Sequence, residues 1–135
     1  MFIYENGKIA KAEIYFNDVQ TGHATYKYDV RGNTVEVLEH EMNTGNEEFL
    51  MIHQKFTYDN SFNPLYHIGF TSVELTQQNN PEYVYYSYAL MCRGPIEYEA
   101  AFEYDKNDLP LKELRKEKGS SETDLFTYHY QWPVK

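Results

Sequence analysis

The five histidines of this chain are the side chains best suited to bind a metal ion. No two of them lie at the spacing of about two to five residues that is typical of a compact zinc site; they are His23, His40, His53, His67 and His129. A site built from distant strands would need pairings that the sequence does not specify. We therefore expect histidines that face solvent and no bound metal. His40, with Glu36 on the same strand face, is the best candidate for a first ligand.

Acidic side chains suggest two further kinds of chemistry. Asp105, Asn107 and Asp108 place three oxygen-bearing side chains within four positions, but the segment lacks the glycine and the distal bidentate glutamate of a calcium loop. Glu97 and Glu99 have the separation of the paired carboxylates in glycosidases. They alternate with apolar residues, however, so we expect both to face solvent, where nothing raises the pKa of a carboxyl group.

The chain has no motif for nucleophilic catalysis. It contains no Gly-x-Ser-x-Gly sequence, and no serine has a histidine close to it in the sequence. Cys92 is the single cysteine, so no internal disulfide can form, and we expect its thiol to be buried and unreactive. The sequence thus predicts a protein that is not an enzyme and needs no cofactor.

Aromatic residues are unusually frequent, with 14 Tyr, 8 Phe and 1 Trp among 135 residues. Tyrosine favours strands, because its ring packs on a pleated surface while its hydroxyl reaches water. The clearest strand is Ile96–Tyr104, where apolar residues alternate with glutamates. Val84–Cys92 is apolar on both faces and predicts a more central strand. Weaker alternation predicts strands at 24–28, 34–40, 48–58, 65–70, 111–118 and 125–131.

Turn residues connect these strands into hairpins. Asn6-Gly7 lies between the strands expected at 2–4 and 8–16, and it suits the two positive φ values of a type I′ turn. Thr44-Gly45-Asn46 and Arg93-Gly94-Pro95 mark two further reversals. Residues 71–81 are mostly polar and predict a loop with at most one short helical turn.

A short pattern occurs three times: an aromatic residue, any residue, Tyr-Asp, a polar linker and an aliphatic residue. The copies begin at residues 26, 56 and 102, which are 30 and 46 residues apart, so the chain is not a regular solenoid. In each copy we expect the aspartate, Asp29, Asp59 or Asp105, to accept hydrogen bonds from backbone N–H groups in a hairpin turn. The prediction is one all-β domain, residues 1–135. It is an antiparallel meander of about ten strands, strongly curved into a half-barrel or distorted barrel.

These segments resemble two kinds of bacterial protein. The aromatic-x-Tyr-Asp pattern, followed by Gly-Asn or Asn-Pro, is similar to the YD repeats of large Rhs-type surface and toxin proteins. Residues 58–65 with Asn79-Asn80-Pro81, and the segment Tyr4–Lys8, resemble a Bacteroidetes domain of unknown function with a porin-like fold, found in lipoproteins. That resemblance implies a curved antiparallel sheet and export to the periplasm or cell surface. The sequence lacks that family's signal and lipidated cysteine, so a cytoplasmic location is the alternative.

The charge of the chain bears on its partners. Its 12 Lys and Arg against 21 Asp and Glu give a formal net charge of −9, and without a basic cluster we expect no nucleic-acid partner. No apolar run approaches the ~18 residues of a membrane-spanning helix. Several tyrosines either fill a concave face or anchor an unknown protein or small-molecule ligand there; these are Tyr83, Tyr85, Tyr86, Tyr88 and Tyr98.

Two functions remain open at this point. The first, which we prefer, is a non-enzymatic binding or structural domain of an exported bacterial protein. The alternative is a small acidic intracellular protein that binds a basic protein partner, as an immunity protein binds its toxin.

Overall fold

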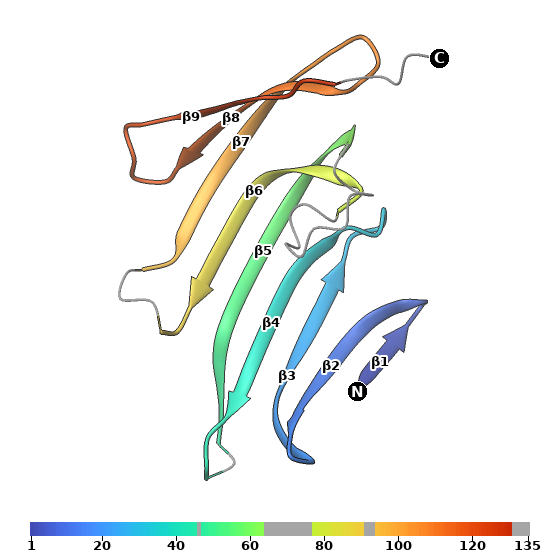
Figure 1. Ribbon diagram of the computed structural model, residues 1–135, viewed down its shortest axis with the longest axis vertical. Helices are drawn as coiled ribbons and strands as arrows, with labels where there is room; N and C mark the ends of the chain where they lie inside the picture. Colours follow the sequence, from blue (N-terminus) through green and yellow to red (C-terminus); the bar gives the residue numbers. More distant parts are fainter. Residues whose placement is uncertain (46, 64–76, 91–93, 131–135) are drawn as a thin grey trace.

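The computed structural model of the chain is one antiparallel sheet of nine strands (Figure 1). It describes residues 1–45, 47–63, 77–90 and 94–130. The strands follow one another across the sheet in chain order, which is the meander that the sequence predicts. They are β1 Phe2–Glu5, β2 Lys8–Phe16, β3 Val19–Tyr28, β4 Thr34–Met42, β5 Glu48–Phe62, β6 Asn79–Tyr88, β7 Ile96–Tyr104, β8 Pro110–Glu117 and β9 Asp124–Thr127.

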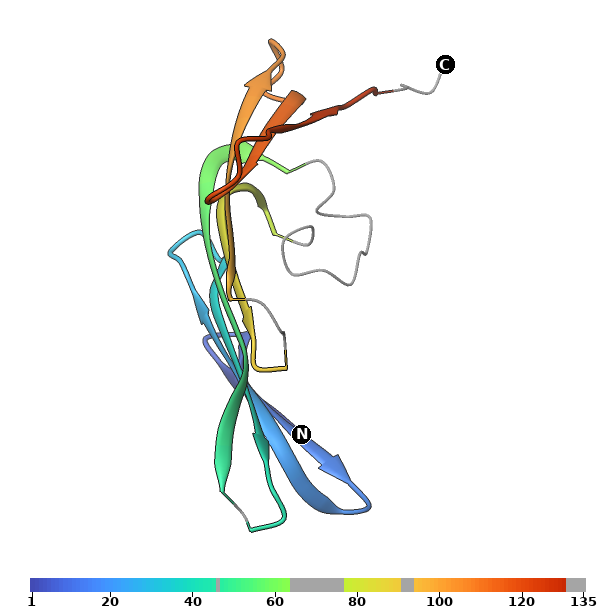
Figure 2. The ribbon, with the colours of Figure 1, turned by 90° about the vertical axis from the view of Figure 1, so that its left-hand side faces the viewer.

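The sheet is bent, and its two ends lean toward the same side when it is viewed along its edge (Figure 2). Register shifts interrupt six of the eight strand pairs, and such irregularities bend strands and increase their twist. β1 and β9 form the two edges, and no pairing between described residues joins them. The described strands therefore make an open, curved sheet. In this part of the chain no helix has the length and hydrophobicity needed to span a bilayer.

Two tight turns connect the first three strands. Asn6 and Gly7 have φ values of 50° and 77°, which confirms the predicted positive-φ turn between β1 and β2. Asn17 and Asp18, with φ values of 49° and 63°, form a second such turn between β2 and β3. The sequence analysis missed this second turn because the pair contains no glycine, although Asn and Asp both tolerate positive φ.

The loop predicted at 71–81 is wrong at its last three residues, because Asn79, Asn80 and Pro81 begin β6. The two asparagine side chains fit a strand here because they donate to groups on β5, Asn79 to the Ser61 carbonyl at 3.0 Å and Asn80 to the Asp59 carboxylate at 3.3 Å. Pro81 has no N–H to donate, and it lies at a register shift of the β5–β6 pair. Residues 71–76 of this loop, the strand predicted at 65–70 and Cys92 lie outside the described residues.

The first and third copies of the repeat close hairpins as predicted. Asp29 Oδ1 accepts the backbone N–H groups of Arg31 and Asn33, both at 2.9 Å, in the turn between β3 and β4. Asp105 Oδ1 does the same for Asn107 and Leu109, at 2.8 and 2.9 Å, between β7 and β8. The two turns thus have one construction.

The hairpin predicted for the second copy is wrong. β5 continues past Asp59 as far as Phe62, and the carboxylate spans two strands instead of one turn. Asp59 Oδ1 accepts the N–H of Ser61 at 3.0 Å and the N–H of Asn80 on β6 at 3.1 Å. The local pattern is the same in all three copies, so the difference comes from the partner strand, which the pattern does not contain.

One face of the sheet, which we call the core face, carries the buried apolar residues; the opposite face is the outer face. Val84 is 2% exposed and packs with Val37, Phe56 and Tyr58. Directly paired residues share a face and alternate residues return to it, so the register assigns each paired strand residue to one face. The aromatic residues of the three repeat copies all lie on the core face: Tyr26, Tyr28, Phe56, Tyr58, Phe102 and Tyr104.

Candidate functional sites

The five tyrosines proposed as anchors divide between the two faces of the sheet. Tyr83 and Tyr85 lie on the outer face, whereas Tyr86, Tyr88 and Tyr98 lie on the core face. All five are half-buried. The structure therefore does not bring them together on one binding surface.

A shallow depression of about 350 Å³ lies beside two of these tyrosines, Tyr83 and Tyr98. Its lining includes Glu97, which accepts the Tyr83 hydroxyl at 3.2 Å and pairs with Lys118 at 3.0 Å. The hydrogen bond from Lys118 lowers the pKa of the Glu97 carboxyl. A paired carboxylate with a lowered pKa is a poor general acid or base at neutral pH, so the depression has the features of a polar surface rather than of an active site.

The three repeat copies meet at one end of the sheet in a buried polar network. Asn33, 1% exposed, donates to the Asp29 carboxylate at 3.0 Å and to the side-chain oxygen of Asn79 at 2.9 Å. It accepts the backbone N–H groups of Gln78 and Asn79 at 3.0 and 3.3 Å. The Tyr104 hydroxyl donates to the Asp59 carboxylate. Because these oxygens are occupied by N–H and O–H donors of the protein itself, the turn acids have a structural role.

The core face remains exposed at the end of the sheet that lies lowest in Figure 1. Four large apolar side chains there, which we call the N-terminal apolar patch, have exposed fractions between 39% and 70%: Phe2, Ile14, Phe16 and Val19. Phe2 pairs with Ala12, and Ala12 pairs with the buried Ala24, so the patch continues directly from the core. Phe49, opposite Glu41, adds a fifth exposed apolar side chain at the same end.

Two carboxylates lie on the core face next to this patch. Glu39 pairs with Ala24, and Glu41 pairs with Gly22 on one side and with Phe49 on the other. Neither carboxylate forms an ion pair with a lysine, arginine or histidine of the described residues. The exposed apolar surface is therefore bordered by unpaired negative charge.

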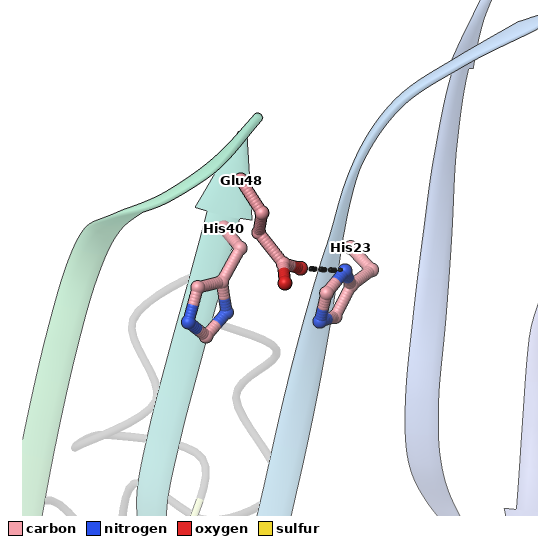
Figure 3. A group of neighbouring side chains, drawn as sticks. All are labelled: His23, His40 and Glu48. Carbon is pink, nitrogen blue, oxygen red and sulfur yellow. Dashed lines mark ion pairs between the residues drawn. The ribbon is translucent and has the colours of Figure 1, made fainter. Parts of the chain in front are cut away.

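Two histidines and a glutamate gather on the outer face at this same end. Figure 3 shows the Glu48 carboxylate beside the rings of His23 and His40, which come from three neighbouring strands. Glu48 Oε1 lies 3.0 Å from His23 Nδ1, and one possible ligand atom from each residue lies within 4.8 Å of the other two. The imidazole rings are stacked, with centroids 5.0 Å apart. This is the group of described residues best placed to hold a metal ion.

The expected association of His40 with Glu36 is wrong. Glu36 instead contacts His53 Nε2 at 3.0 Å and Lys27 Nζ at 2.6 Å. The reason is distance, since residues four apart in a strand are about 13 Å apart, whereas cross-strand neighbours touch. The sequence analysis missed the pairing of His23 with His40 because these residues are neighbours only through the register of β3 and β4.

Comparison with known proteins does not add to this geometry. A search of protein-family models gives no match to the chain, and a search of the curated proteins finds no similar protein.

Proposed function

We propose that this domain is a non-enzymatic binding module whose N-terminal apolar patch holds a protein partner. The observation that carries the proposal is the exposure of large apolar side chains on the same face as the core. Contiguous apolar surface of this kind usually marks an interaction site in soluble proteins. The resemblance to bacterial lipoprotein domains supports placing the module in an exported bacterial protein.

The chemistry of the patch specifies the kind of partner. Glu39 and Glu41 border it without a described cationic partner, and the chain as a whole carries a net charge of −9. A complementary segment would therefore combine apolar and cationic side chains, because charge complementarity favours both encounter and correct register. β1 is a sheet edge with all four residues exposed, and an extended segment can add to such an edge through backbone hydrogen bonds.

A synthetic peptide tests this proposal directly. The probe is a fluorescent peptide of alternating leucine and lysine, and the control is a matched peptide of alternating leucine and glutamate. Fluorescence anisotropy should show saturable binding of the lysine peptide and much weaker binding of the glutamate peptide. Equal binding of both peptides, or binding of neither, would overturn the proposed partner chemistry.

Substitutions then locate the binding surface. Phe16→Ser should weaken binding of the lysine peptide without changing thermal stability, because Phe16 is 70% exposed. Glu41→Gln should also weaken it. Val30→Ser is the matched control, since Val30 is fully exposed in the β3–β4 turn, away from the patch. If Phe16→Ser and Val30→Ser bind alike, the patch is not the binding surface. A wild-type dimer that Phe16→Ser dissociates would show that a second copy occupies the patch instead.

The unpaired carboxylates also favour the alternative function, an intracellular acidic protein that neutralises a basic protein partner. Both functions use the same surface, so peptide binding does not separate them. The gene context does: an upstream export signal with a lipidation cysteine supports the exported module, and an adjacent toxin gene supports the immunity-type protein.

A further inference from the structure

We propose that His23, His40 and Glu48 form a binding site for a divalent transition-metal ion, with zinc the best match. The site is independent of the proposed function, because it lies on the outer face and the N-terminal apolar patch lies on the core face. Two imidazoles and a carboxylate are ligands that zinc accepts, and three protein ligands leave a fourth position for water.

The sheet positions these ligands through its register. His23 and His40 are direct cross-strand partners in β3 and β4. Gly22 allows the close approach of the two strands, since a Cβ at this position would collide with the His40 carbonyl oxygen. The two rings therefore stack side by side on the outer face of the sheet.

A β-bulge brings the third ligand to the same face. β4 pairs Glu39 with Ile52 and then His40 with Leu50, so the pairing skips Met51. Each residue step along a strand reverses the side-chain direction, and the skipped residue therefore turns Glu48 toward the outer face. Without this bulge Glu48 would lie on the core face. Bulges often redirect a side chain at a functional site.

The distances suit a zinc ion after a small adjustment. In a tetrahedral site with zinc–nitrogen and zinc–oxygen bonds of about 2.1 Å, two ligand atoms lie about 3.4 Å apart. The three donor atoms already lie within 4.8 Å of one another, so shifts of about 1.5 Å or less close the site. The Glu48 side chain is 48% exposed and free to make this shift, whereas His23, 16% exposed, is held more firmly.

A second observation points to a missing partner. His40 Nδ1 is buried and has no hydrogen-bond partner among the described residues, although buried polar atoms are nearly always satisfied. A bound metal ion, or a water molecule coordinated to that ion, would give His40 Nδ1 a partner. Two nitrogen ligands select against calcium and magnesium, which prefer oxygen donors.

A fourth carboxylate, that of Glu13, lies near the site but contacts other residues. Glu13 is the direct partner of His23 on β2, but its carboxylate accepts the Tyr15 hydroxyl at 3.0 Å and contacts Lys11 Nζ at 3.5 Å. Glu13 therefore adds negative charge beside the site while remaining engaged elsewhere.

The test is a zinc titration of the full chain without a histidine tag, followed by competition with a chromophoric chelator. The wild type should bind one equivalent of zinc. His40→Ala and Glu48→Gln should each weaken binding by at least about tenfold, the order of loss that disruption of a zinc site produces. Glu48→Gln removes no buried group, so it reports on the metal even if His40→Ala is poorly folded.

His53→Ala is the matched control, because His53 is also an outer-face histidine that contacts a carboxylate, that of Glu36, but no second histidine of the described residues joins this pair. It should bind zinc as the wild type does. The proposal is overturned if the wild type does not bind zinc at submillimolar concentration, if Glu48→Gln binds as tightly as the wild type, or if His53→Ala loses as much affinity as His40→Ala.

Discussion

Replacing Asp59 by alanine tests whether the polar network at the end of the sheet stabilises the fold. Its carboxylate accepts two backbone N–H groups, those of Ser61 at 3.0 Å and Asn80 at 3.1 Å, and two side-chain donors, those of Asn80 and Tyr104. The carboxylate thereby joins β5, β6 and the end of β7. Alanine would leave the two N–H groups without this acceptor.

The expected loss can be estimated from these contacts. A buried donor without an acceptor costs about 1–3 kcal/mol, and the Asn80 and Tyr104 side chains can rotate toward water. Burial raises the pKa of the Asp59 carboxyl, because the buried carboxylate has lost part of its hydration. Removing the carboxylate also removes this desolvation penalty, which offsets part of the loss from the unsatisfied N–H groups. We therefore expect Asp59→Ala to lower the free energy of unfolding by about 2 kcal/mol.

Urea denaturation measures this loss. With a slope of about 1–3 kcal/mol per molar urea, the midpoint should fall by about 1 M. Asp105→Ala is the matched control, since Asp105 occupies the same position of the repeat but accepts N–H groups within a single exposed turn. It should shift the midpoint less. Equal shifts for the two variants would refute the view that Asp59 stabilises the sheet by linking strands.

Three further predictions concern the two faces. Phe56→Ala should lower the free energy of unfolding by about 3–5 kcal/mol in the same assay, because Phe56 is buried in the core. Tyr86→Ala should destabilise the domain more than Tyr85→Ala, because Tyr86 lies on the core face and Tyr85 on the outer face; equal losses would show that both faces are covered. The hydrogen bond from Lys27 lowers the pKa of the Glu36 carboxyl in the folded state. The ionised Glu36 therefore stabilises the fold above the unfolded-state pKa of about 4.5, and this stabilisation is lost as the pH falls through the lower folded-state pKa. Melting temperatures measured against pH should accordingly fall less steeply on the acid side for Glu36→Gln than for the wild type.

The sequence predicted the strands whose alternation is regular and whose ends carry turn residues. Ile96–Tyr104 and the strand at 8–16 have the same bounds in the structure. The predicted Asn6-Gly7 turn limits the start of the second strand, and the predicted Asp105 turn limits the end of the first. The second repeat copy was misread for the opposite reason. Asp59 lies in the same local pattern as Asp29, but its carboxylate accepts a hydrogen bond from the backbone N–H of Asn80 on β6. Asn80 is 21 residues away in the sequence, so the local pattern does not contain this contact.

The metal site was beyond the reach of sequence patterns because one bulge places its third ligand, and the same bulge also extends the apolar patch. Skipping Met51 turns Glu48 to the outer face, beside His23 and His40, and it turns Phe49 to the core face, where it joins the exposed apolar surface. A single-residue change in register exchanges the faces of every residue before it. Met51 is an ordinary buried apolar residue, with no glycine or proline to mark a bulge. The alternation of residues 48–58 predicts a strand correctly. It cannot indicate that residues 48, 49 and 50 each lie on the face opposite to the one that uninterrupted alternation would give them.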